Sequence, residues 1–261
     1  MRIVTFASGS TGNCSLISDG RVNILIDAGI SMRRVVSALS EYGLTPQDLC
    51  GVLITHEHSD HISGLSMLNK YYRLPIFAPP ELCDVLNHMK PELYSSLNAV
   101  NVGEVLNIDC LKVSSFRTPH DSHFSVGYRF EGSSVFAFAT DTGMTTDDML
   151  DGLTGADTAL IEANHDIEML HNGPYPYFLK KRILSDHGHL SNKDSGKLAQ
   201  SLANSGTRRI ILGHLSRENN TPALALSTVK AALEGCDTEV LVAPMSEKLT
   251  VNIGEEEICS V

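Results

Sequence analysis

The sequence predicts an α/β fold in which two sheets pack face to face with helices outside, an αββα four-layer sandwich. Short runs rich in β-branched residues alternate with helical patterns along the whole chain. These strand-like runs fall into an early and a late group, each mixed with helices, as expected for two sheets with helical covers. The 261 residues are 42% hydrophobic and 20% charged, so we expect a single domain over residues 1–261.

The expected strands are short and occur in both halves of the chain. They are apolar runs bounded by polar or turn-forming residues. They occupy Arg2–Phe6, Val22–Ile26, Gly51–Ile54, Leu111–Phe116, Val126–Phe130, Val135–Ala139, Thr158–Ile161, Arg209–Leu212, Glu239–Val242 and Leu249–Ile253. The runs at 126–130 and 135–139 flank Glu-Gly-Ser-Ser, and we expect them to form a hairpin.

Helical patterns separate these strands. Apolar residues recur in them at three- and four-residue spacing, which is typical of a helix with one buried face. They occupy Met32–Tyr42, Gly64–Tyr71, Glu81–Met89, Thr146–Leu150, Tyr177–Leu184, Asn192–Asn204 and Pro222–Leu233. The whole segment HISGLSMLNKYY, residues 61–72, is expected to continue as a helix.

The net charge and the apolar runs limit the classes of function. A net charge of -11 weighs against a nonspecific nucleic-acid binder, although a short basic run such as Lys180-Lys181-Arg182 can contribute to a local patch. No apolar run approaches the length of a membrane span, and the first residues lack the apolar core of a secretory signal. We therefore expect a cytoplasmic protein with no membrane partner.

The cysteines are scattered along the chain without a Cys-x-x-Cys pair. This spacing argues against a zinc ribbon or a thioredoxin-like redox motif. Several lie in apolar stretches, where a free cysteine behaves as a small buried apolar residue, so we expect reduced structural thiols. The six are Cys14, Cys50, Cys83, Cys110, Cys236 and Cys259.

Five apolar strand-like runs are followed by a residue of metal-ligand type. If polar residues merely marked strand ends, Ser, Asn and Gly would occur there as often as Asp, His and Glu. Because ligands gather at the carboxyl ends of strands in α/β sheets, these side chains are expected to converge on one edge. The five residues are Asp27, His56, Asp141, Glu162 and His214.

The segment Thr-His-Glu-His-Ser-Asp-His, residues 55–61, is the strongest local signal in the chain. Imidazole and carboxylate groups together suit Zn²⁺, Mn²⁺ or Fe²⁺. His56 and His58 occupy alternate positions after a strand and can face one cation, while Asp60 and His61 lie on the next turn and can reach a second. A structural zinc site has four ligands, whereas this segment and its partners offer more potential ligands than one such site uses, so we expect two divalent ions.

Distant residues complete the two expected ligand sets. His120 supplies a third imidazole to the first ion, with His123 as the alternative in that position, and His214 completes the second. Asp141 has the short carboxylate suited to bridging, and Asp27 is expected to orient a ligand histidine. The first set is His56, His58, His120 and Asp141, and the second is Asp60, His61, Asp141 and His214.

Taken together, these motifs resemble a known superfamily. The H-x-H-x-D-H segment, PHD…GYRF, ATDTG and the final LGHLS resemble the metallo-β-lactamase superfamily over the whole chain. Within it, FASGSTGNCSLI, THEHSDHISGL, LIEANHDIEML, RILSDHGHLSNKDSG and ILGHLSRENNTPALA are similar to the YycJ (WalJ) family of nuclease-like proteins. The chain is also similar to ribonuclease Z, but Glu162-Ala163-Asn164 lacks the leading His of that group's H-E-A-T signature, which puts tRNA processing in doubt.

This resemblance implies a dinuclear metal phosphodiesterase acting as a 5′→3′ exonuclease on DNA, with RNA as an alternative substrate. Two cations can lower the pKa of a bridging water and hold a hydroxide in line with phosphorus, and Asp60 would orient it. Glu162 and His189, by analogy to ribonuclease Z, would deliver a proton to the leaving oxygen. The alternative is a small-molecule ester, thioester or lactone hydrolase of the same fold.

The tetrapeptide Gly-His-Leu-Ser occurs twice, at residues 188–191 and 213–216. Their flanking sequences differ, so a duplicated unit is a poor explanation. His214 follows an apolar strand, as the other expected ligands do. His189 instead precedes Ser191 and Asp194, an S-x-x-D helix start, and is expected on a loop. We therefore predict that His214 is a metal ligand and that His189 transfers the proton.

The loop at residues 8–13 is either a phosphate-binding loop or a tight connection.

Overall fold

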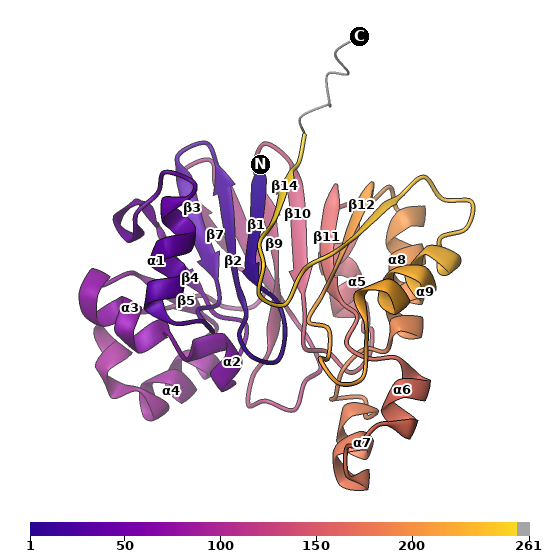
Figure 1. The fold of residues 1–261 in the computed structure, drawn as a ribbon. Helices are drawn as coiled ribbons and strands as arrows, with labels where there is room; N and C mark the ends of the chain where they lie inside the picture. Colours follow the sequence, from indigo (N-terminus) through magenta and orange to yellow (C-terminus); the bar gives the residue numbers. More distant parts are fainter. Residues whose placement is uncertain (255–261) are drawn as a thin grey trace.

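Two seven-stranded sheets pack face to face in this computed structural model, which describes residues 1–254, and helices cover both outer faces (Figure 1). The predicted αββα sandwich is confirmed. The prediction of one domain over residues 1–261 extends past the described residues, and Cys259 also lies outside them.

The first sheet contains the amino-terminal strands and the last strand of the described chain. Its order is β14-β1-β2-β3-β4-β5-β6. The strands are β1 (Arg2–Ala7), β2 (Cys14–Asp19), β3 (Val22–Ile26), β4 (Gly51–Leu53), β5 (Ile76–Ala78), β6 (Leu97–Ala99) and β14 (Leu249–Asn252). Strands β3 to β6 run parallel to one another, so the ends of β3 and β4 reach the same edge.

The second sheet has the order β13-β12-β11-β10-β9-β8-β7. Its strands are β7 (Val105–Ile108), β8 (Leu111–Arg117), β9 (Val126–Glu131), β10 (Val135–Ala139), β11 (Thr158–Glu162), β12 (Arg209–Gly213) and β13 (Glu239–Val242). Strands β9 and β10 form the predicted antiparallel hairpin. Strands β10 to β13 are parallel, so β10, β11 and β12 end at one edge of this sheet.

Helices cover the outer faces of both sheets. In Figure 1, α1, α3 and α4 lie on the first sheet and α5, α8 and α9 on the second, while α6 and α7 project at one end. The helices are α1 (Met32–Ser40), α2 (Ser59–Ile62), α3 (Leu65–Tyr72), α4 (Pro80–Met89), α5 (Asp147–Leu153), α6 (Ile167–Asn172), α7 (Tyr177–Ile183), α8 (Asn192–Asn204) and α9 (Pro222–Ala232), with 3-10 turns η1 (Pro46–Asp48) and η2 (Pro91–Ser96). Across residues 1–254, none of the helices combines the length and apolar character that crossing a membrane requires.

Successive residues of each strand face opposite sides of its sheet, and this alternation divides the core into three layers. In β3, Ile24 and Ile26 lie between the two sheets, whereas Leu25 belongs to the cluster on the outer face. In β12, Ile211 lies between the sheets and Leu212 joins the outer cluster with residues of α8 and α9. Each central strand is therefore apolar on both faces, which explains its continuous apolar run in the sequence.

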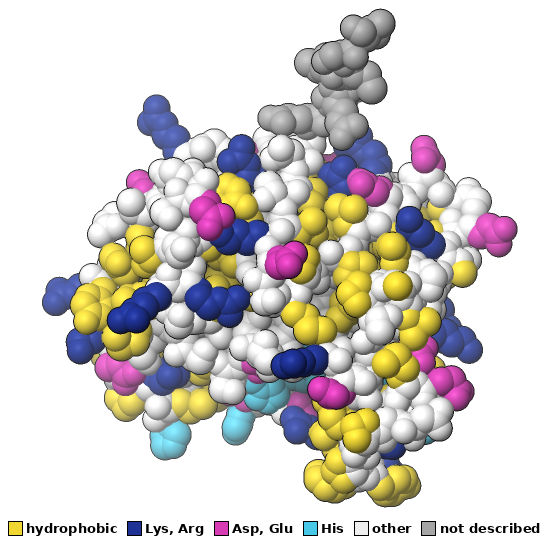
Figure 2. Space-filling model, viewed as in Figure 1, with side chains coloured by type: hydrophobic (Ala, Val, Ile, Leu, Met, Phe, Trp, Pro, Cys, Tyr) yellow, Lys and Arg dark blue, Asp and Glu magenta, His cyan; other side chains and the backbone are white. Residues whose placement is uncertain are grey.

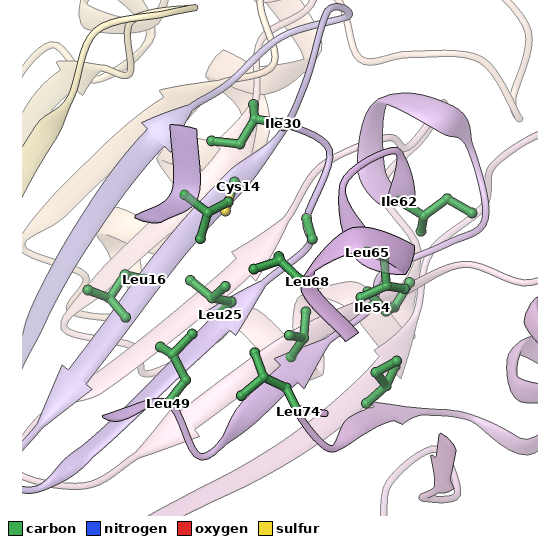
Figure 3. Close-up of a cluster of buried hydrophobic side chains, with 14 of the residues drawn as sticks. Cys14, Leu16, Leu25, Ile30, Leu49, Ile54, Ile62, Leu65, Leu68 and Leu74 are labelled. Carbon is green, nitrogen blue, oxygen red and sulfur yellow. The ribbon is translucent and has the colours of Figure 1, made fainter. Parts of the chain in front are cut away.

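The outer cluster of the first sheet anchors the segment that carries the metal-ligand motif. Leu16 and Leu25 from the sheet belong to the same cluster as Leu65 and Leu68 from α3 (Figure 3). All four side chains are at most 1% exposed. Burial of a leucine side chain stabilises a fold by about 1.5–3 kcal/mol, so this packing holds α3, and α2 just before it, firmly against the sheet.

The helix expected over residues 61–72 is interrupted. Helix α2 ends at Ile62 and α3 begins at Leu65. The break arises from tertiary contacts, since the Gly64 N–H donates to the Ala28 carbonyl at 2.8 Å and the Ser63 hydroxyl donates to the Gly29 carbonyl. A Cβ on Gly64 would lie 2.0 Å from the Ile30 carbonyl oxygen, so only glycine permits this approach.

Four strands and one helix were not expected from the sequence. Strands β5 and β6 have three residues each, and β7 is an edge strand of four, so none is long enough for a clear alternation. The sequence of β2, CSLISD, mixes serines into a strand that is buried on both faces. Helix α6 is a short turn of six residues. These elements owe their conformation to their neighbours in the sheet or loop more than to their own pattern.

Candidate metal centre

The carboxyl ends of five strands and the residues just after them form one polar cluster between the two sheets. Asp27 follows β3 and His56 follows β4 in the first sheet. In the second sheet Asp141 follows β10, Glu162 ends β11 and His214 follows β12. The structure therefore brings together the five strand-end residues singled out in the sequence. All five are at most 2% exposed.

Three of these residues have an unusual backbone conformation. The φ angles of Asp27, Asp141 and His214 are 60°, 56° and 54°, in the left-handed region that non-glycine residues rarely adopt. Each such residue costs on the order of 1–3 kcal/mol and persists only where its surroundings enforce it. The strained backbone at these three strand ends turns the side chains into the cluster.

His56, His58 and His120 form the first group of donor atoms. His58 Nδ1 lies 3.1 Å from His56 Nε2 and 3.3 Å from His120 Nε2. Burial lowers the pKa of both His56 and His120 below its usual value, so both rings stay neutral. A neutral imidazole has a free lone pair, and ring nitrogens of three histidines that face one point suit a cation of the zinc type.

Asp60, His61 and His214 form the second group. Asp60 Oδ2 lies 3.5 Å from His61 Nε2 and 3.6 Å from His214 Nε2. The short helix α2 carries both Asp60 and His61, and its N-terminal cap is His58, so one turn supplies donors to both groups. The donor atoms of each group lie within 4.8 Å of one another.

Asp141 lies between the two groups. Its Oδ2 is 3.3 Å from His61 Nε2, and its Oδ1 is 3.8 Å from His120 Nε2. Burial raises the pKa of Asp141, but His214 and His61 outweigh this and hold the pKa well below its usual value. The carboxylate is thus ionised, and its two oxygens lie near histidines of both groups, with Oδ1 also 3.4 Å from His214 Nδ1, which suits a ligand shared by the two groups.

Asp27 fixes the orientation of His61. Its Oδ2 lies 2.7 Å from His61 Nδ1, and the same oxygen accepts a hydrogen bond from the Thr55 hydroxyl at 2.9 Å, while Oδ1 accepts one from the Thr55 N–H. Burial lowers the pKa of His61, but Asp27 and Asp141 together raise it to about 10. The contact leaves His61 Nε2 facing Asp60 and Asp141, and an orienting role for Asp27 stays a prediction.

Glu162 joins His189 to His214. Its Oε1 lies 2.7 Å from His189 Nδ1 and 2.9 Å from His214 Nδ1, while Oε2 accepts hydrogen bonds from the backbone N–H groups of Thr142 and Leu190. Burial raises the pKa of Glu162, but contact with the two histidines lowers it to about 2. The sequence pairs Glu162 with His189 alone, because no local spacing reveals its contact with His214.

Asn13 is a further polar residue of the site that sequence reasoning did not single out. Its Nδ2 lies 2.9 Å from His61 Nε2 and 3.2 Å from Asp60 Oδ2, and its Oδ1 accepts a hydrogen bond from the Gly9 N–H at 2.9 Å. The loop at residues 8–13 therefore contacts the second group directly. No spacing in the sequence marks an asparagine for this position, since its partners are 47 and 48 residues away.

His123 and His165 lie outside the donor groups. The side chain of His123 is 76% exposed and pairs with Glu57, its Nδ1 lying 2.9 Å from Glu57 Oε1. The structure thus places His120, and not His123, in the first group. His165 is buried beside Ser191, and burial lowers its pKa to about 4, so its ring stays neutral.

The chemistry of this cluster fits divalent cations. Within residues 1–254, the ion pairs of Asp27, Asp60, Asp141 and Glu162 are all with histidines, so no lysine or arginine balances four carboxylates. Asp141 Oδ2 and His214 Nε2 are also buried without a hydrogen-bond partner. Buried carboxylates and unpaired polar atoms are costly unless a counter-charge meets them. Nε2 and carboxylate oxygens aimed at common points are suitable donors for that charge.

Comparison with known proteins agrees with the fold. The sequence profile of the Beta-lactamase superfamily domain matches residues 22–215. Among solved structures, Zn²⁺-bound PqqB from Methylobacterium extorquens is 18% identical with a TM-score of 0.75, over 97% of this chain and 100% of that one, which is a likeness of fold. The fold and the site define a metal-dependent hydrolase of the β-lactamase superfamily.

Sequence relatives narrow this class to one family. Exodeoxyribonuclease WalJ from Streptococcus pneumoniae is 38% identical over 238 residues, covering 90% of this chain and 88% of that protein. Exodeoxyribonuclease YycJ from Bacillus anthracis is 36% identical over 230 residues, 87% of each chain. The chain belongs to the WalJ (YycJ) family of the β-lactamase superfamily, and the resemblance predicted from its motifs is confirmed.

Proposed function

We propose that this protein is a 5′→3′ DNA exonuclease that uses two divalent metal ions to hydrolyse phosphodiester bonds. The observation that carries the proposal is the pair of donor groups that share Asp141, with the Glu162–His189 pair beside them. The exodeoxyribonuclease names of relatives spanning about nine tenths of the chain support DNA as the substrate.

The proposed ligands divide between the two groups. His56, His58 and His120 would hold one ion, Asp60, His61 and His214 would hold the other, and Asp141 would contact both. Zn²⁺ or Mn²⁺ suits these nitrogen and oxygen donors, with Fe²⁺ as the alternative. When bound, such ions supply Lewis-acid charge that lowers the pKa of a water and offsets the charge on phosphate oxygens.

The protein's own residues position the reaction and move the leaving-group proton. Asp60 is the donor residue nearest to solvent in its group, with 23% of its side chain exposed, and would orient the attacking water toward phosphorus. His189 uses Nδ1 to contact Glu162, which leaves Nε2 for the leaving oxygen. Burial lowers the pKa of His189, but Glu162 and Asp141 raise it above the usual value, so the ring carries the proton that a general acid delivers.

Digestion of end-labelled DNA tests this proposal. Purified protein with Mn²⁺ or Zn²⁺ should release labelled mononucleotides first from the 5′ end of single- or double-stranded DNA, and RNA of the same sequence should be cut more slowly. It should also hydrolyse bis(p-nitrophenyl) phosphate, whereas thioester and lactone substrates should be inert. Preference for a thioester or lactone with no release of nucleotides would replace the proposal by small-molecule hydrolysis. Release from the 3′ end would reverse the proposed polarity.

A further inference from the structure

Helix α7 carries a pair of exposed aromatic side chains at its free end. Tyr177 and Phe178 are 75% and 74% exposed, the largest exposed fractions among the exposed large apolar residues of the described chain. The α6–α7 segment projects from the end of the sandwich to which α2 and the strand ends also point (Figure 1). In Figure 2, apolar side chains gather at this projecting tip, and histidines are visible on the neighbouring edge.

The projecting helix is connected directly to the proposed catalytic residues. After α7 the chain turns back at once, and the His189 N–H donates to the Ile183 carbonyl at 3.0 Å. The Gly188 carbonyl lies 3.2 Å from His120 Nδ1, and Arg182 forms an ion pair with Asp121, the residue after His120. The position of α7 relative to His189 and His120 is therefore set by contacts at its base.

The charge of α7 is opposite to that of the protein as a whole. Its last turn carries Lys180, Lys181 and Arg182, whereas the chain has a net charge of -11. Arg182 is paired with Asp121 and Lys180 Nζ donates to the His171 carbonyl at 2.7 Å, whereas Lys181 is exposed and places its Nζ 5.7 Å from the centre of the Tyr177 ring. Positive charge interleaved with exposed aromatic rings is the combination that binds single-stranded nucleic acid, through backbone attraction and base stacking.

We propose that Tyr177 and Phe178 form a stacking platform for the bases of a single DNA strand, while Lys181 attracts its phosphates. This inference rests on the proposed nuclease function and adds to it a binding site for the part of the strand outside the metal centre. A strand that lies on α7 meets the site beside His189, where the leaving oxygen would be protonated. The exposed Lys181 favours DNA over a second copy of this chain, because lysine is depleted from protein–protein interfaces.

Single substitutions at the platform test the proposal, because both rings are exposed and their removal leaves the core unchanged. Tyr177→Ala and Phe178→Ala should each raise the KM for a single-stranded 20-mer about tenfold, as expected for the loss of one stacked base. The kcat/KM for bis(p-nitrophenyl) phosphate and for a dinucleotide should not change, since neither reaches α7. Phe178→Trp should keep the KM of the unaltered protein, and Phe178→Leu should not.

The chain offers a matched control on another helix. Tyr71 of α3 is 60% exposed, and Lys70 Nζ lies 5.9 Å from its ring centre, so this pair has the same chemistry as Tyr177 and Lys181. Tyr71→Ala should leave the KM for the 20-mer unchanged. If the KM for the 20-mer is the same in Tyr177→Ala, Phe178→Ala and the unaltered protein, the platform proposal is wrong. If all three proteins still hydrolyse DNA, the nuclease proposal stands.

Two further outcomes would also contradict the DNA platform. If the unaltered protein hydrolyses bis(p-nitrophenyl) phosphate but neither cuts nor binds the 20-mer, the nuclease proposal fails and the platform fails with it. If light scattering shows a dimer that Phe178→Ala converts to a monomer, with the 20-mer KM unchanged, α7 is an interface between copies and the DNA platform is wrong.

Discussion

The two Gly-His-Leu-Ser segments have the same sequence but hold their histidines in different ways. His214 follows strand β12 with a φ of 54°, its N–H donates to the Ser8 hydroxyl and its carbonyl accepts from Asn164. His189 lies on the loop between α7 and α8, where 22% of its side chain is exposed and Ser191 caps α8 as the sequence predicts. Both rings contact the same oxygen of Glu162.

This difference shows that the backbone, and not the local sequence, separates the proposed roles of the two histidines. His214 is buried at a strained strand end and its Nε2 lies 3.6 Å from Asp60 Oδ2, which suits a fixed ligand. His189 keeps one edge toward solvent, which suits a group that must exchange a proton in each turnover. Glu162 orients both rings, so it couples the ligand to the proton donor.

The largest effect is expected from His214→Ala. Loss of one of three donors in the second group should reduce bound metal from the proposed two ions to one per chain and abolish DNA hydrolysis. Elemental analysis of the purified variant measures the first effect. His123→Ala is the matched control, because this exposed histidine lies outside the donor groups and its removal should leave metal content unchanged. Retention of two ions by His214→Ala would contradict the proposed ligand set.

His189→Ala should have a smaller and different effect. It should keep both ions and lower kcat on DNA by about 10²–10⁴, the usual contribution of general acid–base catalysis. The loss should be much smaller for bis(p-nitrophenyl) phosphate, whose weakly basic leaving group needs no proton. His187→Ala, an exposed histidine on the same loop, should retain full activity. Metal loss equal to that of His214→Ala would remove the distinction between the two histidines.

Glu162→Gln should give the smallest loss of activity and affect both histidines. The buried amide would place an N–H₂ group against existing N–H donors, so we expect stability to fall by about 1–3 kcal/mol. Metal affinity and kcat should each fall about 10- to 100-fold, as is typical when a group that orients a ligand is changed. Thermal unfolding and titration with metal measure these effects. A change in kcat with unaltered metal affinity would show that Glu162 serves His189 alone.

The architecture could be predicted because its central strands are continuous apolar runs, apolar on both faces. Runs such as 135–139 and 209–212 are long enough to stand out, whereas β5 and β6, with three residues each, depend on their neighbours. The break at Gly64 could not be foreseen, because it is caused by the approach of the backbone at Ala28 and Ile30, which are distant in sequence.

The sequence by itself determined which residue types stand at the strand ends and how they are spaced, since covalent order and strand periodicity suffice for that. It therefore indicated His56, His58, Asp60 and His61 as one cluster and Asp141 and His214 as its distant partners. Only the tertiary structure decided that Glu162 contacts both His189 and His214, that Asn13 contacts His61, and that His120 and not His123 joins the first group. Those contacts depend on how two sheets pack and how loops turn, and packing joins residues that no local pattern relates.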